Sequence, residues 1–139
     1  MALIPEGRRR FRFHLDGESG VPTYRQIIDQ VTGAIARGAL MPGDQLPTVR
    51  QLAVDLSINP NTVIRAYREL EIRGVLETQQ GTGTFIGQVK PENREGERER
   101  RLGQLVSDFL SRAGAEGFTV EEAIAQLQEL QTGGPKRRR

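Results

Sequence analysis

Apolar side chains recur at helical spacing in three segments of the first 90 residues. The first predicted helix runs from about Thr23 to Arg37, with an apolar stripe of Tyr24, Ile27, Ile28, Val31 and Ile35. Thr23 and Gln26 have the spacing of a capping box, and Gly38 is suited to end the helix. The next segment, MPGDQLP, is predicted to be a turn, because a residue that precedes proline avoids helical geometry.

The second and third predicted helices lie close together in the sequence. Thr48 is the predicted N-cap of the second helix, with Gln51 three residues later, and Asn59 followed by Pro60 is a strong start signal for the third. Their inward faces are Val49, Leu52, Ala53 and Leu56 in one, and Val63, Ala66, Tyr67 and Leu70 in the other. Only Ser57 and Ile58 separate them, which predicts a steep crossing and a helix-turn-helix.

Alternating apolar and polar residues predict short strands in two places. Residues 75–79 and 84–86 are expected to pair as a hairpin, with Gly81 and Gly83 at the tip, where positive φ costs little. Near the N-terminus, a short strand with one buried face is predicted by the alternation of Phe11, Phe13 and Leu15 with Arg10, Arg12 and His14. The hairpin after three helices makes the predicted domain a winged helix-turn-helix.

The last third of the chain predicts two amphipathic helices after the polar segment 91–101. The first spans about 98–113, and Thr119 with Glu122 has capping-box spacing at the start of the second. The apolar stripes are Leu102, Leu105, Val106, Phe109 and Leu110, then Val120, Ala123, Ile124, Leu127 and Leu130. Two short helices bury little surface alone, so we expect both stripes, above all Ile124, Leu127 and Leu130 in the second, to pack against another copy of the chain.

These elements predict a mainly helical, α+β chain with four parts. They are a basic arm or short strand at 1–20, the winged helix-turn-helix at 21–90, a linker with a two-helix dimerisation domain at 91–131, and a disordered basic tail at 132–139.

Composition excludes several classes of function. The chain has no cysteine and only one histidine, His14, which excludes disulfides and sites built on thiolates or several imidazoles. No Ser–His spacing or tuned carboxylate pair is apparent, so we expect no catalytic residue, no cofactor and no metal. Without an apolar run of membrane-spanning length or a signal peptide, a soluble cytoplasmic protein is expected, with no membrane partner.

The net charge of +2 is spread along the chain, so the placement of charges has to indicate the partner. The third predicted helix presents Asn61, Ile64, Arg65 and Arg68 opposite its core face, with Thr62 at the N-terminal edge. Asn61 can pair with adenine, and Arg65 with guanine or a phosphate, when such a helix enters the major groove. The alternative is a solvated face on which the arginines pair with Glu69 or Glu71.

Three further basic or polar segments can be interpreted either as DNA contacts or as ordinary solvent-exposed or structural residues. Arg50 lies near the start of the second helix, where a cation is disfavoured unless a phosphate faces it; a solvated arginine is the alternative. Gln80, Gly81 and Thr82 at the wing tip suit close approach to DNA, although a tight hairpin needs glycine anyway. Residues 8–12 resemble a basic arm or a strand end, and 136–139 a flexible tail.

With these residues in view, residues 11–88 resemble the GntR family of bacterial regulators, in particular its small YtrA-like branch. The resemblance is carried by SGVPTYRQI, GALMPGDQLPTVRQLAVDLSINPNTVIRAYRELEIRGVLE and GTGTFI. It implies DNA contacts by Arg50, by the helix start at Asn59, Pro60, Asn61 and Thr62, and by the wing at Gly81 and Gln80. Many relatives in other branches have arginine where this chain has Pro60 and Ile64, so Arg65 is left as a candidate substitute.

The resemblance also implies that the last two helices dimerise, because they are too short for the larger effector-binding domains. Such regulators usually repress transporter operons, including their own. The predicted function is therefore a homodimeric repressor that binds an inverted-repeat operator in double-stranded DNA, and no cluster of residues indicates an effector. The rival prediction is a winged-helix adaptor that binds a protein partner, suggested by the near-neutral charge and the uncharged wing.

Overall fold

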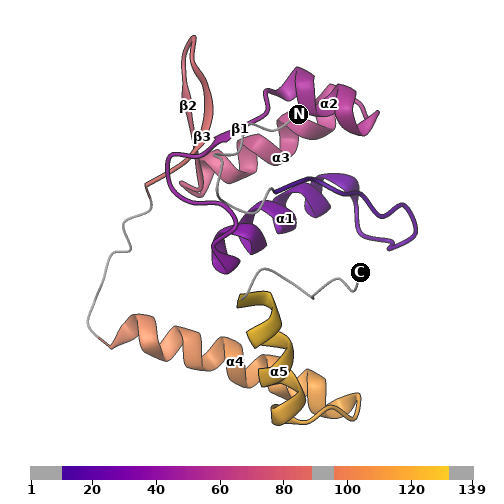
Figure 1. Cartoon of the computed structure of the whole chain (residues 1–139), viewed down its shortest axis with the longest axis vertical. Helices are drawn as coiled ribbons and strands as arrows, with labels where there is room; N and C mark the ends of the chain where they lie inside the picture. The colour runs from indigo at the N-terminus through magenta and orange to yellow at the C-terminus, as the bar shows by residue number, and fades with distance from the viewer. Residues whose placement is uncertain (1–10, 89–95, 132–139) are drawn as a thin grey trace. The chain divides into compact units, whose positions relative to one another are not determined.

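A computed structural model describes residues 11–88 and 96–131 of the chain, which divides into one compact unit up to Val89 and another from Lys90 on. The first unit contains α1 (Thr23–Arg37), α2 (Val49–Leu56) and α3 (Pro60–Ile72), with a small sheet of β1 (Gln45–Leu46), β2 (Leu76–Gln79) and β3 (Gly83–Ile86) (Figure 1). The second unit contains α4 (Glu97–Ala115) and α5 (Val120–Gln131). The proposed arm residues 8–10 and tail 132–139 lie outside the described ranges.

The core of the first unit forms around α3, which packs against α1, α2 and β2. The largest fully buried side chains come from α1, the loop that follows it, β1, α2 and α3: Ile27, Ile28, Val31, Leu40, Leu46, Leu52, Val63 and Leu70. The predicted inward faces of α1, α2 and α3 are thus confirmed in outline, since the apolar stripes of all three helices meet in one core.

The helix starts are confirmed for α2 and α3 but not for α1. Thr48 Oγ1 accepts from Gln51 N at 3.0 Å, and Asn59 Oδ1 accepts from Asn61 N at 2.7 Å. The capping box predicted for Thr23 and Gln26 is wrong, because α1 has Pro22 as its N-cap without a side-chain bond. The amide of Gln26 instead donates to the carbonyl oxygens of Asp16 and Val21, both at 2.9 Å.

The strand predicted at residues 11–15 is also wrong, although its alternation is real. Phe11 is buried and Arg12 exposed, but the segment lies along α1 and pairs with two glutamine side chains. Gln30 exchanges two hydrogen bonds with the His14 backbone, and Gln26 two with Asp16. The four residues from Gln26 to Gln30 advance about 6 Å along the helix, and two extended residues advance about 6.6 Å, so the two glutamines match the spacing of His14 and Asp16 and replace a partner strand.

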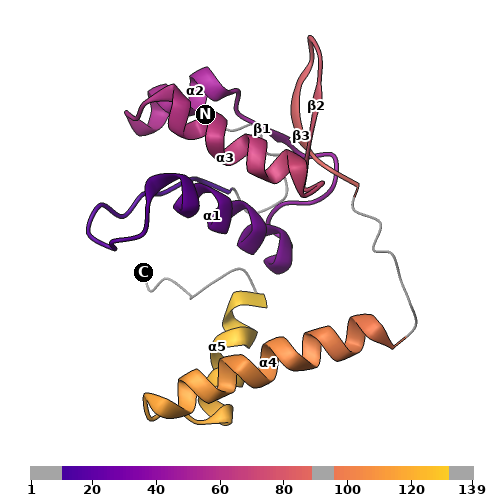
Figure 2. The same ribbon diagram turned by 180° about the vertical axis from the view of Figure 1, so that it is seen from behind.

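The sheet has one strand that the sequence did not predict. β1 pairs with β3, giving the order β1-β3-β2, and all pairs are antiparallel. β1 has only two residues and lies inside the segment predicted as a turn, where buried Asp44 accepts from Met41 N at 2.9 Å. The predicted hairpin is confirmed, with Gln79 opposite Gly83. Figure 2 shows this wing projecting from the helices.

The second unit has no buried residue in either helix. Apart from half-buried Leu110, its large apolar side chains are exposed along both helices; Leu102 of α4 is 61% exposed and Leu127 of α5 is 59% exposed. The predicted capping box is confirmed, because Thr119 N donates to Glu122 Oε1 at 2.9 Å and Glu122 N to Thr119 Oγ1 at 3.2 Å. Among the described residues, no helix is both long and apolar enough to cross a membrane.

Candidate nucleic-acid interface

The outward face of α3 is polar and open, as its sequence pattern predicts. Asn61, Ile64, Arg65 and Arg68 are exposed and Thr62 is half-buried, while Val63, Ala66 and Tyr67 on the other side are buried. Pro60 fixes the first turn and offers no N–H group. Asn59 uses its side-chain carbonyl oxygen for the cap, which leaves its amide N–H groups as the side chain's remaining hydrogen-bond donors.

The acidic residues that offer an alternative role for Arg65 and Arg68 are engaged elsewhere. Glu69 pairs with Arg73, with 3.3 Å between Oε2 and the Arg73 terminal nitrogen, and Glu71 accepts from the Thr78 hydroxyl. Within the described ranges no carboxylate forms an ion pair with Arg65 or Arg68. Two arginines without a carboxylate partner on one exposed helix face attract a polyanion more strongly than they would if acidic residues neutralised them.

Arg65 has a neighbour that the sequence did not indicate. Its guanidinium carbon lies 3.8 Å from the centre of the Tyr24 ring, so the second turn of α3 touches the start of α1. Tyr24 was predicted only as part of the apolar stripe of α1, and it is half-buried against the core. Sequence spacing gave no signal for this contact, because 41 positions separate the two residues.

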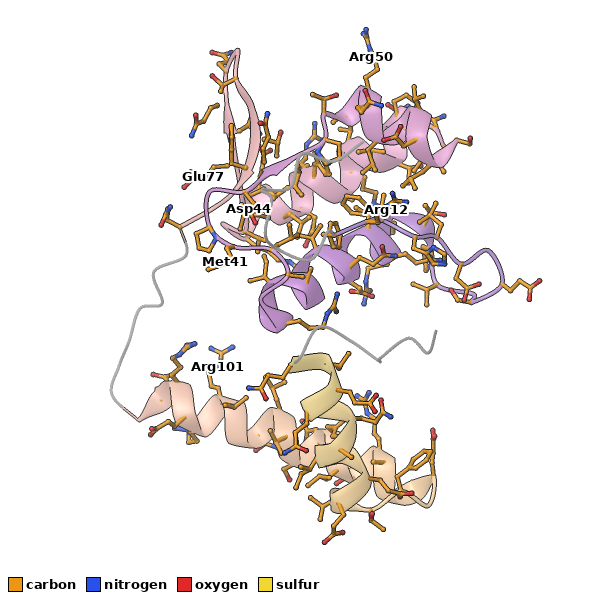
Figure 3. The ribbon with its side chains drawn as sticks, in the orientation of Figure 1. Arg12, Met41, Asp44, Arg50, Glu77 and Arg101 are labelled. Atoms are coloured by element: carbon orange, nitrogen blue, oxygen red, sulfur yellow. The ribbon has the colours of Figure 1, made fainter. Side chains whose placement is uncertain are left out.

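Arg50 lies at the second position of α2, as predicted, and its side chain is exposed. It points away from the domain body, on the same side as the tip of the wing (Figure 3). The first turn of α2 contains no acidic residue, and no ion pair of Arg50 occurs in the part of the chain that the structure describes. An anion in front of the helix would therefore meet both a guanidinium and the positive end of the helix dipole.

A buried tyrosine fixes the loop before α2 against α3. Tyr67 Oη donates to the carbonyl oxygen of Pro47 at 2.7 Å, and burial raises the pKa of this phenol, which stays protonated as the donor. The bond joins α3 to the residue that precedes the Thr48 cap. Arg50 and the outward face of α3 are consequently held in one arrangement, a role that the sequence pattern did not reveal beyond placing Tyr67 in the core.

The wing tip is exposed at Gln80, Gly81 and Thr82, and Gly81 has a φ of +79°. Thr82 N donates back to the Gln79 carbonyl oxygen at 2.9 Å, and Gln45 Nε2 donates to the Thr82 carbonyl oxygen at 3.2 Å. A Cβ at Gly83 would collide with that Gln45 nitrogen. The loop is thus braced from β1, and its side chains are left free for a partner.

Comparison with known proteins places this arrangement among bacterial regulators. Residues 23–86 match the family described as bacterial regulatory proteins, gntR family. The chain is 40% identical to the HTH-type transcriptional repressor YtrA of Bacillus subtilis, over 88% of this chain and 96% of that protein. It is 36% identical to the uncharacterized HTH-type transcriptional regulator YhcF of the same organism, over 84% of this chain and 96% of that protein.

Solved structures agree with these sequence relatives. A GntR-family transcription factor, YtrA from Sulfolobus acidocaldarius, superposes with a TM-score of 0.54 at 32% identity, covering 71% of this chain and 97% of that one. A transcriptional antiterminator from Listeria monocytogenes EGD-e superposes with a TM-score of 0.67 at 25% identity, over 91% and 97%. The curated relatives that match nearly their whole length are regulators rather than enzymes.

Proposed function

The chain belongs to the GntR family of transcriptional regulators and groups with its YtrA-like members, and we propose that it is a sequence-specific repressor that binds an inverted-repeat operator as a homodimer. The observation that carries the proposal is the open face of α3, where Arg65 and Arg68 have no carboxylate partner among the described residues. One relative that matches over nearly its whole length supports the direction of control, since YtrA of Bacillus subtilis is named a repressor.

In the proposed complex, the N-terminal half of α3 lies in the major groove. Asn61 pairs with adenine, and exposed Ile64 offers an apolar surface that fits a thymine methyl group. Thr62 and the amide N–H groups of Asn59 contact the backbone or the edges of the groove, while Pro60 contributes only apolar contact. Base contacts near the start of α3 are the usual geometry for a recognition helix.

Outside the groove, the proposal assigns phosphate contacts to Arg50 and close backbone or minor-groove contacts to the wing tip. Arg50 is exposed and without an ion pair in the described ranges, so the free energy of binding is not reduced by breaking one. Gly81 brings the backbone near the DNA, and Gln80 and Thr82 supply neutral hydrogen-bonding groups. An uncharged wing then adds contact without adding to the salt dependence of binding.

The dimer is proposed because the apolar side chains of the second unit are not buried within the chain. Neither α4 nor α5 buries a residue, and their exposed large apolar side chains fall on one stripe of each helix. A soluble surface seldom leaves such a stripe uncovered, and a second copy supplies an identical stripe. We assign the interface to Leu102, Leu105, Val106, Phe109, Leu110, Ile124, Leu127 and Leu130.

The test is selection of binding sites from a random DNA library by the full-length chain. The proposal predicts enrichment of an inverted repeat whose half-sites lie roughly 34–36 Å apart, or a multiple of this, because two recognition helices related by a two-fold axis read the same face of the duplex. Enrichment of a single unrepeated half-site would overturn the dimeric part. Enrichment of no sequence at all would overturn DNA recognition and favour the adaptor.

A further inference from the structure

The contact between Arg65 and Tyr24 joins two helices at the edge of the proposed DNA surface. The guanidinium carbon is 3.8 Å from the ring centre, a distance typical of a cation held against an aromatic face. Tyr24 packs against the core and is only half-exposed, so it is a firm support rather than a mobile side chain. A cation–π contact of this kind restricts an otherwise flexible arginine before any ligand arrives.

The contact leaves the hydrogen-bonding capacity of Arg65 unused. Guanidinium N–H groups lie in the plane of the group, so a ring against its face does not occupy them. Within residues 11–88, Arg65 makes no ion pair, and the nearest acid on its own helix, Glu69, pairs with Arg73. Because Arg65 is exposed, these donors are open to a ligand, and their forked arrangement matches the oxygens of a phosphate.

The direction of the side chain distinguishes a phosphate from a base. Arg65 lies one turn after Asn61, on the same face of α3, but its guanidinium lies over a residue of α1. An arginine that reads guanine must extend from the recognition helix toward the base edges, whereas this one is held against a neighbouring helix. Resting on the proposed function, we propose that Tyr24 is a positioning residue that holds Arg65 for a DNA phosphate at the edge of the groove.

The test uses full-length variants and a labelled duplex obtained by the selection described above. Arg65→Ala should weaken binding equally on this duplex and on its single-base-pair variants, and should reduce the slope of log Kd against log salt concentration by about 1 for each bound protomer. Tyr24→Leu keeps an apolar side chain on the core but removes the ring, and should weaken binding roughly three-fold for each bound protomer.

A double-mutant cycle separates positioning from a structural role. Tyr24→Leu should have no further effect in the Arg65→Ala background, and Tyr24→Phe should restore binding in full because it keeps the aromatic face. Arg37→Ala is the matched control, since it removes one positive charge from the last residue of α1, at the opposite end of that helix from Tyr24, and it should leave the salt slope unchanged.

Each failure has its own meaning. If the wild-type chain does not prefer the selected duplex, the proposed function fails. If it does, the positioning role is overturned by an equal effect of Tyr24→Leu with and without Arg65. Loss of preference at one base pair in Arg65→Ala would overturn the phosphate assignment and make Arg65 a base reader, and unchanged binding by that variant would overturn the whole inference.

Discussion

At the scale of single residues, the start of α3 shows how one side chain can serve the fold and the proposed interface together. Asn59 Oδ1 accepts the Asn61 N–H group at 2.7 Å, which satisfies one of the free donors at the start of the helix. The amide N–H groups of Asn59 face away from this bond and are available to DNA oxygens. The two roles depend on different atoms, so substitutions can separate them.

Asn59→Ala should lower the free energy of unfolding by about 1 kcal/mol, because the helix loses its cap. Asn59→Asp should retain the stability, since its carboxylate still accepts the N–H bond at the positive end of the helix. It should nevertheless weaken DNA binding, because it loses the donors and adds a negative charge near phosphates. Urea denaturation and a DNA titration of both variants check this, and unchanged affinity of Asn59→Asp would place Asn59 away from DNA.

The sequence predicted the exposed residues of the candidate site better than their contacts. Helical spacing and the Asn59–Pro60 start were enough to place Asn61, Arg65 and Arg68 on the outward face. The contact between Tyr24 and Arg65 could not be predicted. The side chains that meet between two packed helices are set by the angle at which the helices cross, and not by the spacing of residues within either helix. For the same reason, the brace from Gln45 to the Thr82 carbonyl had no sequence signal.

At the scale of elements, the pattern of apolar residues predicted the helices but not every strand. The alternation at residues 11–15 correctly identified an extended segment with a buried face, yet it could not show that glutamines of α1 replace a strand as its partner. β1 was not predicted because a strand of two residues is too short to give a periodic signal. In both places, hydrogen bonds to distant segments decide the structure.

The turn between α2 and α3 requires a left-handed backbone conformation at one residue, and this requirement can be tested. Ser57 has a φ of +57°, a left-handed conformation in a residue other than glycine, and Ile58 N then donates to the Ala53 carbonyl oxygen at 3.0 Å. Ser57→Gly should keep or raise the stability, and Ser57→Val should lower it by about 1–2 kcal/mol because a branched Cβ is crowded there. Thermal unfolding of the pair checks the prediction, and equal stability of both would contradict it.

At the scale of the whole molecule, the two units differ in how they are stabilised. The first has a contiguous buried core, whereas no residue of α4 or α5 is buried. A helix pair of this size gains little from its own packing, so its stability is expected to come from the second copy. Dimerisation would then raise affinity for DNA by joining two weak half-site contacts into one binding event.

Leu105→Asp should convert the dimer to a monomer, because a carboxylate would be buried without a partner in the apolar interface. Ser107→Asp adds the same charge on the opposite face of α4 and is expected to remain dimeric. Analytical ultracentrifugation measures the mass of each variant, and the DNA titration should show a large loss of affinity for Leu105→Asp alone. A dimeric Leu105→Asp with wild-type affinity would contradict the proposed interface.

The measurement that tests the central claim most directly is a titration of the full-length chain against the selected duplex and a scrambled duplex of equal length, at several salt concentrations. Two phosphate contacts per protomer, by Arg50 and Arg65, predict tight binding to the selected duplex alone, with a slope of log Kd against log salt concentration of about 4 or more for the dimer. Equal and weak binding to both duplexes, or binding that does not change with salt, would contradict a sequence-specific DNA-binding repressor.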